Sequence, residues 1–364
     1  MADQGFVLAP ATEIVSVSIA LEPTFNITNN LMLLSKPEER SGFSSWVYET
    51  SAKLSPEVKH RHELIFTTLA RAVEPVENWP SFPAYIEHLS SIDAEVLRDR
   101  AIEWLGEKHI EEIVPPDKDT VLHDREAYLN TIEQIYLQKW EKEHTFDRSL
   151  YSEAHDWLQD PPALKTLLIN HLRQMWDEVL KADWERNLPI LQESVDAYQQ
   201  LEYAQMTALE AVRAVTGRDF RGIWDEWGKE LIFIPSPHIG PYLTRFDDDK
   251  NRVTRVIFGA RLPEGARVSS PALSRSELLV RLSALADDTR LQILELLTTH
   301  DELCAQDVIE MLDLSQSAAS RHLRQLTATG YLVERRREVA KCYSLNPQRV
   351  DDTLRALKRF LRAK

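Results

Sequence analysis

The amino-acid sequence predicts an α+β protein that is mostly helical, with a large N-terminal helical domain containing a small antiparallel sheet, followed by a separate C-terminal domain. Its 364 residues exceed the usual size of one domain, roughly 150 residues. Residues 271–364 carry 15 basic and 13 acidic side chains, a net of +2, whereas residues 1–270 carry a net of −17. All nine tryptophans lie between Trp46 and Trp227. We therefore expect two unlike domains, residues 1–265 and 275–364, joined by a linker at 266–274.

The composition is that of a folded, globular chain. Hydrophobic residues make up 43% and charged residues 28%, which excludes a disordered or low-complexity class. A net charge of −15 taken over the whole chain argues against nucleic acid as a partner. That argument fails for the C-terminal domain, because Ser315–Asn346 contains six basic and only two acidic residues.

The N-terminal domain opens with an alternating strand and continues with amphipathic helices. Ser55 followed by Pro56 marks one helix start. The expected elements are a strand at Glu13–Leu21, helices at 56–73, 93–108, 124–144, 163–184 and 191–215, and strands at Leu231–Ile234, Tyr242–Phe246 and Val253–Phe258. The short strands follow Pro- and Gly-containing turns, and we expect the N-terminal strand to join them in one sheet.

The C-terminal domain begins with two leucine-rich helices, at Glu277–Asp287 and then to Leu297 after a cap at Asp287 or Asp288. A short helix at Ala305–Leu312 and a turn lead into a helix capped by Ser315, which Gly330 ends. Two strands follow, Tyr331–Arg336 and Lys341–Leu345, as a hairpin with a basic tip.

The helix that follows Ser315 has the chemistry of a DNA-reading element. One face carries small polar residues and arginines, and the other carries leucines and Ala319. Ser and Gln can hydrogen-bond base edges, Arg can grip guanine bidentately, and a helix N-terminus favours phosphate. The hairpin tip would contact phosphates or the minor groove. The expected DNA-binding residues are Ser315, Gln316, Ser317, Ser320, Arg321, Arg324, Arg335, Arg336, Arg337 and Lys341.

The stretch LSALADDTRLQILELL and the segment ELCAQDVIEMLDLSQSAASRHLRQLTATGYLVERRREVAKCYSLN together resemble the winged helix-turn-helix of the ArsR family of bacterial repressors. The resemblance covers about 90 residues of the chain. It implies a homodimer, formed by the first and last helices of this domain, that binds an inverted-repeat operator in double-stranded DNA. One departure is the wing turn at 338–340, which lacks the family's usual glycine. The implied dimer-interface residues are Leu278, Leu282, Leu354, Leu357 and Leu361.

The metal sites for which the family is known do not carry over, so we expect no metal and no cofactor. An arsenic-type site needs two nearby thiolates, and Gln306 stands where a second cysteine should follow Cys304. The last helix has Asp351 and Asp352 but no histidine after them. We expect Cys304 and Cys342 to pack as small apolar residues; a redox switch joining them is the alternative.

The first 260 residues resemble, weakly, the long extra domain that some ArsR-type regulators carry ahead of the winged helix. No catalytic or nucleotide-binding motif is present, so an enzyme is not expected. His60 and His62 do not share a helix face, and both are expected to be solvated. His144, His155 and His171 lack metal-ligand spacing. The tryptophans either fill the core or line a ligand pocket, for which the candidates are Trp140, Trp157, Trp176, Trp184, Trp224 and Trp227.

The loop Ser236–Tyr242 is expected either to line such a pocket or to dock on the DNA-binding domain. Together these features predict a cytoplasmic, dimeric, sequence-specific transcription regulator, a repressor, whose N-terminal domain senses an unidentified effector. The alternatives are an enzyme or a protein-interaction domain with an appended winged helix. We expect no signal peptide and no membrane helix, since the apolar run Ile14–Leu21 is short and interrupted by serines.

Overall fold

The chain separates into two units of structure in the computed structural model, which describes residues 9–10, 14–106, 116–139, 146–218, 226–261, 271–337 and 340–362. Unit 1 comprises Met1–Glu22, Glu38–Trp46 and Arg186–Lys364, and unit 2 comprises Pro23–Pro37 and Val47–Glu185. Most of the predicted linker at 266–274 lies outside the described residues, and its last four residues already belong to a helix.

The described residues of unit 2 form helices joined by loops, with no strand among them. Side-chain caps start many of its helices, as when Ser55 accepts a hydrogen bond from the Val58 amide and Asp160 from the Ala163 amide. The helices are α1 (Pro23–Ser35), α2 (Ser45–Lys53, which begins in unit 1), α3 (Pro56–Thr68), α4 (Phe82–Ser91), α5 (Ala94–Glu103), α6 (Lys118–His123), α7 (Arg125–Lys139), α8 (Arg148–Leu158) and α9 (Pro161–Met175).

Two helix predictions differ from the structure. The predicted helix at 163–184 does not end there, because α9 continues through a π-helical turn, Trp176–Leu180, into α10 (Lys181–Gln199). The predicted helix at 191–215 is split, since its C-terminal part is a separate helix, α11 (Ala208–Thr216), capped by Thr207. Helix α1 was not predicted, because its buried residues include three asparagines and it therefore lacks the apolar stripe of an ordinary amphipathic helix.

A four-stranded sheet forms the core of unit 1 in the order β2 (Ser16–Ile19), β4 (Glu230–Ser236), β6 (Val253–Gly259), β5 (Leu243–Asp248). The prediction that the N-terminal strand joins the sheet is confirmed. The prediction of an antiparallel sheet is wrong in detail: β2 and β4 are parallel, β4 and β6 are parallel, and only β5 runs antiparallel to β6. Every residue of β4 after Glu230 is buried, a continuous apolar run typical of parallel strands.

A smaller ribbon pairs β1 (Ala9–Pro10) with β3 (Glu226–Trp227). Trp227 itself is fully buried in the apolar core around the sheet, and Arg245 lies over its ring at 4.9 Å. In the same unit the Arg255 guanidinium forms a buried ion pair of 2.7 Å with Glu22. Arg245 lies in β5 and pairs with Val256, the neighbour of Arg255 in β6, and successive side chains of a strand point to opposite faces, so the two arginines make these contacts on opposite faces of the sheet.

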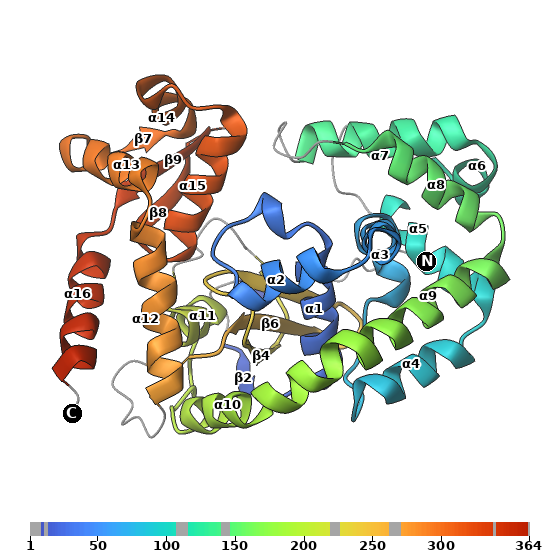
Figure 1. Ribbon diagram of the computed structural model, residues 1–364, viewed down its shortest axis with the longest axis horizontal. Helices are drawn as coiled ribbons and strands as arrows, with labels where there is room; N and C mark the ends of the chain where they lie inside the picture. The colour runs from blue at the N-terminus through green and yellow to red at the C-terminus, as the bar shows by residue number, and fades with distance from the viewer. Residues whose placement is uncertain are drawn as a thin grey trace. The chain divides into compact units, whose positions relative to one another are not determined.

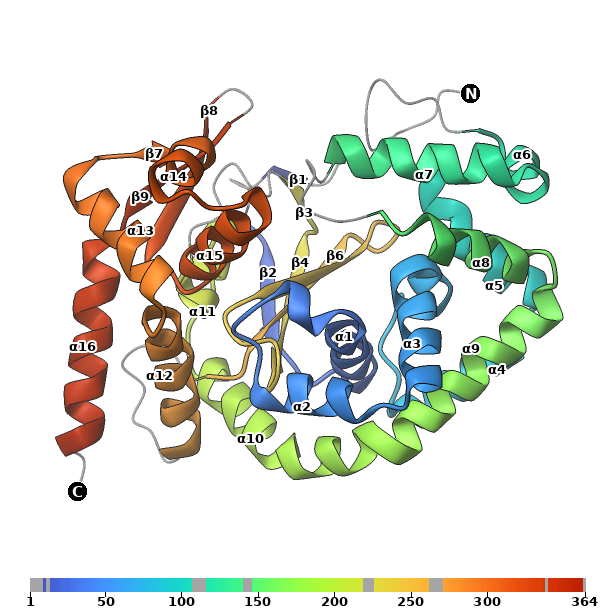
Figure 2. The same ribbon diagram turned by 45° about the horizontal axis from the view of Figure 1, so that its top comes forward.

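The C-terminal part of unit 1 has the predicted order of elements (Figures 1 and 2). It consists of α12 (Pro271–Leu285), α13 (Asp288–Thr299), β7 (Leu303–Cys304), α14 (Ala305–Leu312), α15 (Gln316–Ala328), β8 (Leu332–Arg337), β9 (Ala340–Leu345) and α16 (Pro347–Arg362). The strands form an antiparallel sheet in the order β7-β9-β8. This arrangement confirms the winged helix-turn-helix, and α16 runs beside α12 in both views.

Candidate nucleic-acid interface

The helix α15 is fixed in place by its N-terminal cap and by its buried face. The Ser315 hydroxyl accepts a hydrogen bond of 3.2 Å from the Ala318 amide, and Asp313 takes a left-handed conformation in the preceding turn. Ala319, Leu323 and Leu326 are at most 1% exposed, and the two leucines belong to the core of the winged domain. The opposite face of α15 is therefore the one presented outward.

The outward face holds the residues that the sequence named for base contact. Ser315, Gln316, Ser317 and Arg321 are exposed, and they surround the N-terminal turn of α15. Ser320 and Arg324 are half-buried, with an Arg324 Nη2 to Ser320 Oγ distance of 3.4 Å. The structure thus brings these six residues onto one surface. The small polar side chains lie at the N-terminal end of α15, and the two arginines lie one to two turns further along the helix.

The wing presents basic side chains that differ in how tightly they are held. Arg335 is exposed, whereas the Arg337 Nε lies 2.8 Å from the Glu302 carboxylate. The Lys341 ammonium is 3.9 Å from Glu334. The wing turn predicted to lack its usual glycine includes residues 338 and 339, which lie outside the described residues, as does the Arg336 side chain.

A disulfide joins Cys304 and Cys342 across β7 and β9. The expectation that the two cysteines pack as separate apolar residues is wrong, because the sheet register places them directly opposite each other. Cys342 is fully buried. The bond ties the start of α14 to the wing, and so connects the two elements on either side of α15.

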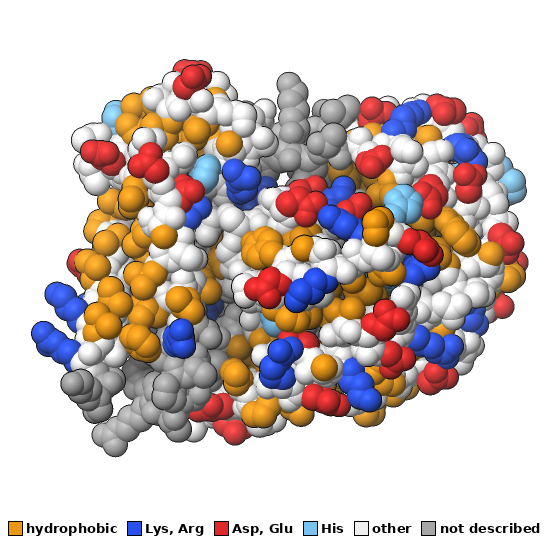
Figure 3. Space-filling model, in the orientation of Figure 1, with side chains coloured by type: hydrophobic (Ala, Val, Ile, Leu, Met, Phe, Trp, Pro, Cys, Tyr) orange, Lys and Arg blue, Asp and Glu red, His pale blue; other side chains and the backbone are white. Residues whose placement is uncertain are grey.

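The helices α12 and α16 expose an apolar surface (Figure 3). Leu354 is 47% and Leu361 is 69% exposed, while Leu282 and Leu357 are half-buried. The expectation that Leu278 lies on this surface is wrong. Its side chain is only 6% exposed, because it faces the interior of the chain. Each helical residue is rotated by about 100° from the last, and the adjacent Leu279, 56% exposed, takes the outward position.

Two segments of unit 1 outside the winged domain lie near α15, and only one of them was predicted from the sequence. The Ser41 hydroxyl donates a hydrogen bond to the Gln325 side chain, which is only 2% exposed. The predicted docking loop, Ser236–Tyr242, lines a pocket together with residues of α12 and α16 and the end of α15, so it faces the winged domain, and its docking there stays a prediction. Gly240 in this loop has a φ of +62°, and a Cβ there would clash with the Gly42 carbonyl at 1.9 Å.

The histidines of unit 2 that the sequence singled out differ in burial. His60 is exposed and lies 2.8 Å from Glu153, but the expectation that His62 is solvated is wrong, because it is 1% exposed and contacts His171. His155 is buried beside the Val121 carbonyl, and His144 lies outside the described residues. Among the residues that the structure describes, no group of three His, Cys, Asp or Glu side chains is arranged to hold a metal ion.

The predicted aromatic pocket has no counterpart in the pocket beside the winged domain, which no tryptophan lines. Trp227 is buried in the sheet core. Trp157, Trp176 and Trp184 are half-buried in helices, and Trp140 and Trp224 lie outside the described residues. No helix in the described part of the chain is both long and apolar enough to cross a bilayer.

Comparison with known proteins places the similarity in the C-terminal part. Residues 287–333 match the family described as "Bacterial regulatory protein, arsR family". The arsenical resistance operon repressor of Staphylococcus aureus is 35% identical over 85 residues, 23% of this chain and 81% of that protein. The arsenic resistance transcriptional regulator ArsR1 of Pseudomonas putida is 42% identical over 64 residues, 18% of this chain and 50% of that protein. An arsenical resistance operon repressor of Escherichia coli is 44% identical over 63 residues, 17% of this chain and 54% of that protein.

Proposed function

The chain belongs to the arsR family of bacterial regulatory proteins, and from this premise we propose that it is a dimeric, sequence-specific transcription regulator that represses its target genes. It carries the DNA-binding domain of the family at its C-terminal end. It spans only about half the length of the Pseudomonas putida and Escherichia coli relatives, so the activity of the whole protein is part of the proposal.

The observation that carries the proposal is the exposed N-terminal turn of α15. Its Ser315, Gln316 and Ser317 side chains are exposed ahead of Arg321, which matches the way a recognition helix enters the major groove. The Arg335 side chain on the wing is exposed as well and would contact the phosphate backbone beside that groove. The basic charge therefore sits where a duplex would meet the domain.

The proposed dimer uses the apolar surface of α12 and α16. Leu279, Leu354 and Leu361 are largely exposed, and Phe360 is 39% exposed. A contiguous apolar patch on a folded chain is typical of a protein interface. Pairing this surface with its copy around a twofold axis would place two recognition helices for an inverted-repeat operator.

The proposed effector domain is the remainder of the chain, and its signal would reach α15 through contacts inside unit 1. The segment Glu38–Trp46 carries the Ser41 to Gln325 hydrogen bond, and the ring of Trp46 stacks on His238 at 4.1 Å. A change in either segment would shift α15, whose placement decides operator affinity. A thiolate metal centre of the arsenic type is not proposed, since Gln306 replaces the second cysteine and Cys304 is joined to Cys342.

The direct test uses a duplex recovered from a random library by selection with the full chain. Replacing Arg321 and Arg324 together by alanine should weaken binding at least about tenfold, because each base-directed arginine contributes about 1–3 kcal/mol. The matched control is Arg173→Ala, an arginine of α9 outside the winged domain. If the double variant binds the selected duplex as tightly as the control does, α15 does not contact the DNA.

A further inference from the structure

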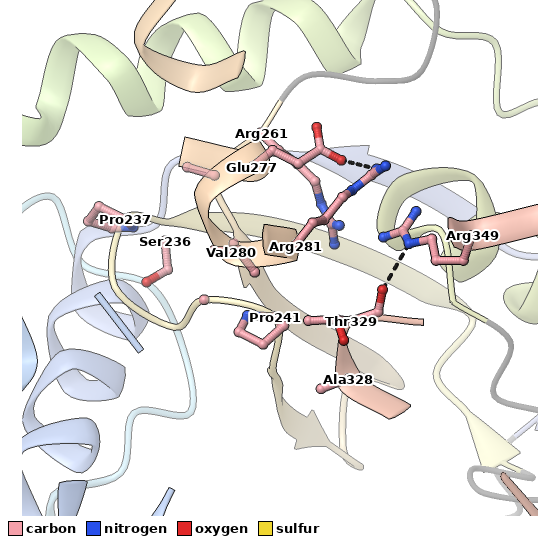
Figure 4. Close-up of a pocket in the computed structure, with 13 residues that line it drawn as sticks. Ser236, Pro237, Pro241, Arg261, Glu277, Val280, Arg281, Ala328, Thr329 and Arg349 are labelled. Carbon is pink, nitrogen blue, oxygen red and sulfur yellow. Dashed lines mark hydrogen bonds and ion pairs between the residues drawn. The ribbon is translucent and has the colours of Figure 1, made fainter. Parts of the chain in front are cut away.

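A pocket lies within unit 1 where the loop after β4 meets the winged domain (Figure 4). The space between its walls, counted together with the part that is open to solvent, is about 490 Å³. The loop at 236–241 and the end of β6 line one side, and α12, the C-terminal end of α15 and the start of α16 line the other. The pocket therefore touches both the sheet and the helices on which the proposed DNA binding depends.

The lining is strongly basic. Arg261 follows β6, Arg281 lies in α12 and Arg349 lies in α16, and their side chains converge in the pocket. Glu277 is the one carboxylate among the lining residues, and it forms an ion pair with Arg281. Three guanidinium groups against one carboxylate leave the lining with two uncompensated positive charges.

These positive charges act on one another. Burial, followed by the charges of Arg281 and Arg261, lowers the pKa of Arg349 to about 10. Burial, followed by the charge of Arg261, lowers the pKa of the nearby Arg218 to about 10 as well. Like charges held together in a partly buried site favour an anion among them.

Two donors in the pocket have no acceptor in the part of the chain that the structure describes. The Nε groups of Arg261 and Arg281 are buried and make no hydrogen bond there. The Arg349 Nε is satisfied, since it donates to the Thr329 carbonyl at 2.8 Å. A buried guanidinium donor without an acceptor is unfavourable, and an anion bound beside Arg261 and Arg281 would bring acceptor oxygens to their guanidinium groups.

The rest of the lining is apolar. Pro237, Pro241, Ala260, Val280 and Ala328 form the walls next to the arginines. We propose that this pocket binds a small organic anion whose carboxylate or phosphate group lies against Arg261, Arg281 and Arg349, with its hydrocarbon part against those walls. Guanidinium groups are the side chains best suited to paired hydrogen bonds with such oxygens.

The position of the site gives the anion a regulatory role, a step that rests on the proposed DNA-binding function. A bound anion would hold α12 and α16 to the loop at 236–241, next to Thr329 at the end of α15. The Tyr331 hydroxyl, two residues on, lies 3.2 Å from the Arg281 carbonyl and 3.0 Å from the Thr353 hydroxyl of α16, and it can donate its one proton to either. Binding would thus change the placement of α15 relative to the helices of the proposed dimer.

Isothermal titration calorimetry of the full chain tests the site without DNA. The probes are inorganic phosphate and the aliphatic mono- and dicarboxylates of two to six carbons, with succinamide as the uncharged match for succinate. At least one anion should bind with a millimolar or lower dissociation constant, and succinamide should not bind. Absence of saturable binding by every anion overturns the proposal.

Substitutions then locate the binding. Arg261→Gln and Arg281→Gln should each weaken it at least about tenfold, the usual contribution of a charged hydrogen bond. Glu277→Gln should strengthen it, because it removes the lining's carboxylate. Arg213→Gln, which removes an exposed arginine from α11, is the control and should leave it unchanged. Because misfolding cannot strengthen binding, tighter binding by Glu277→Gln supports the assignment. Weaker binding by Glu277→Gln in a variant that keeps the wild-type circular dichroism spectrum contradicts it, as does wild-type affinity in both arginine variants.

Operator binding supplies the second measurement. The saturating anion should change the dissociation constant of the selected duplex at least about fivefold, a typical allosteric coupling, and should have no effect in Arg281→Gln. An unchanged constant overturns the regulatory role while the calorimetry still decides the site. If the chain selects and binds no duplex, with or without the anion, the proposed DNA-binding function is contradicted. The calorimetric result for the pocket does not depend on that outcome.

Discussion

A chain of hydrogen bonds through two buried histidines should make unit 2 sensitive to acid. The His62 Nε2 lies 2.8 Å from the Leu31 carbonyl and must donate to it. His62 Nδ1 is then an acceptor and receives the His171 Nε2 proton at 2.9 Å. His171 Nδ1 in turn accepts from Arg61 Nε at 3.3 Å. Both rings are therefore neutral, and a further proton on either ring would face an existing donor.

The size of the loss in unfolding free energy follows from the pKa values of the two histidines. Burial lowers the pKa of His62 from 6.5 to about 4. Burial, followed by the charges of His62 and Arg61, lowers that of His171 to about 3. Below pH 6.5 the unfolded chain binds more protons than the native chain. The contribution of the two histidines to the free energy of unfolding is therefore fully present above that pH and is lost as the pH falls toward 4. By proton linkage each histidine accounts for about 2 kcal/mol lost between pH 7.5 and pH 5.

The assay is urea unfolding followed by tryptophan fluorescence, with Trp157 and Trp176 reporting from unit 2. Between pH 5 and 6 the two histidines should contribute about 2.4 kcal/mol per pH unit to the slope of the unfolding free energy. Replacing His62 and His171 by glutamine should remove that contribution, whatever the stability of the variant. An unchanged slope would refute the neutral hydrogen-bond chain. The exposed His60, replaced by glutamine, is the control.

Three further outcomes are expected. Arg335→Ala should reduce the slope of log affinity against log salt by about 0.9 for each phosphate that the side chain neutralises, and Arg337→Ala should reduce it less, because Glu302 already holds that side chain; equal effects in titrations of the selected duplex would contradict this ranking. Reducing the Cys304–Cys342 bond, which closes a loop of 38 residues, should lower the stability of the winged domain by up to about 4 kcal/mol; a denaturation midpoint unaffected by dithiothreitol in wild type, or shifted equally in a Cys342→Ser variant, would contradict it. Leu354→Glu should raise the dimer dissociation constant at least about thirtyfold, since it replaces about 2 kcal/mol of apolar burial with a charge; an unchanged sedimentation profile would exclude this surface.

The winged domain was predictable because its elements are close together in sequence. Helix caps at Asp287 and Ser315, leucine periodicity and a Gly330 stop are local signals. The exposed face of α15 follows from the same periodicity, since burying Leu323 and Leu326 turns Arg321 outward. Leu278 shows the limit of such patterns, because periodicity places a stripe on a helix but does not say which neighbour covers its edge.

The sheet and the histidines were not predictable at this level. Strand direction depends on where the chain returns after more than two hundred residues, as when Val17 pairs with Leu231 in a parallel register. His62 was expected in solvent because it does not share a helix face with His60, and a solvated position is the default for such a residue. Its burial depends on His171 and Leu31, which approach it from other helices.

By itself the sequence determined the winged helix-turn-helix, the outward face of α15, the basic wing and the division of charge between the body and the tail. These depend on caps, periodicity and composition, which act over a few turns of chain. Only the tertiary structure decided that Arg261, Arg281 and Arg349 meet in one pocket, that Cys304 lies opposite Cys342, and that Ser41 reaches Gln325. Each of these joins residues that are 20 to 284 positions apart, and such pairings are set by packing of the whole unit rather than by local preference.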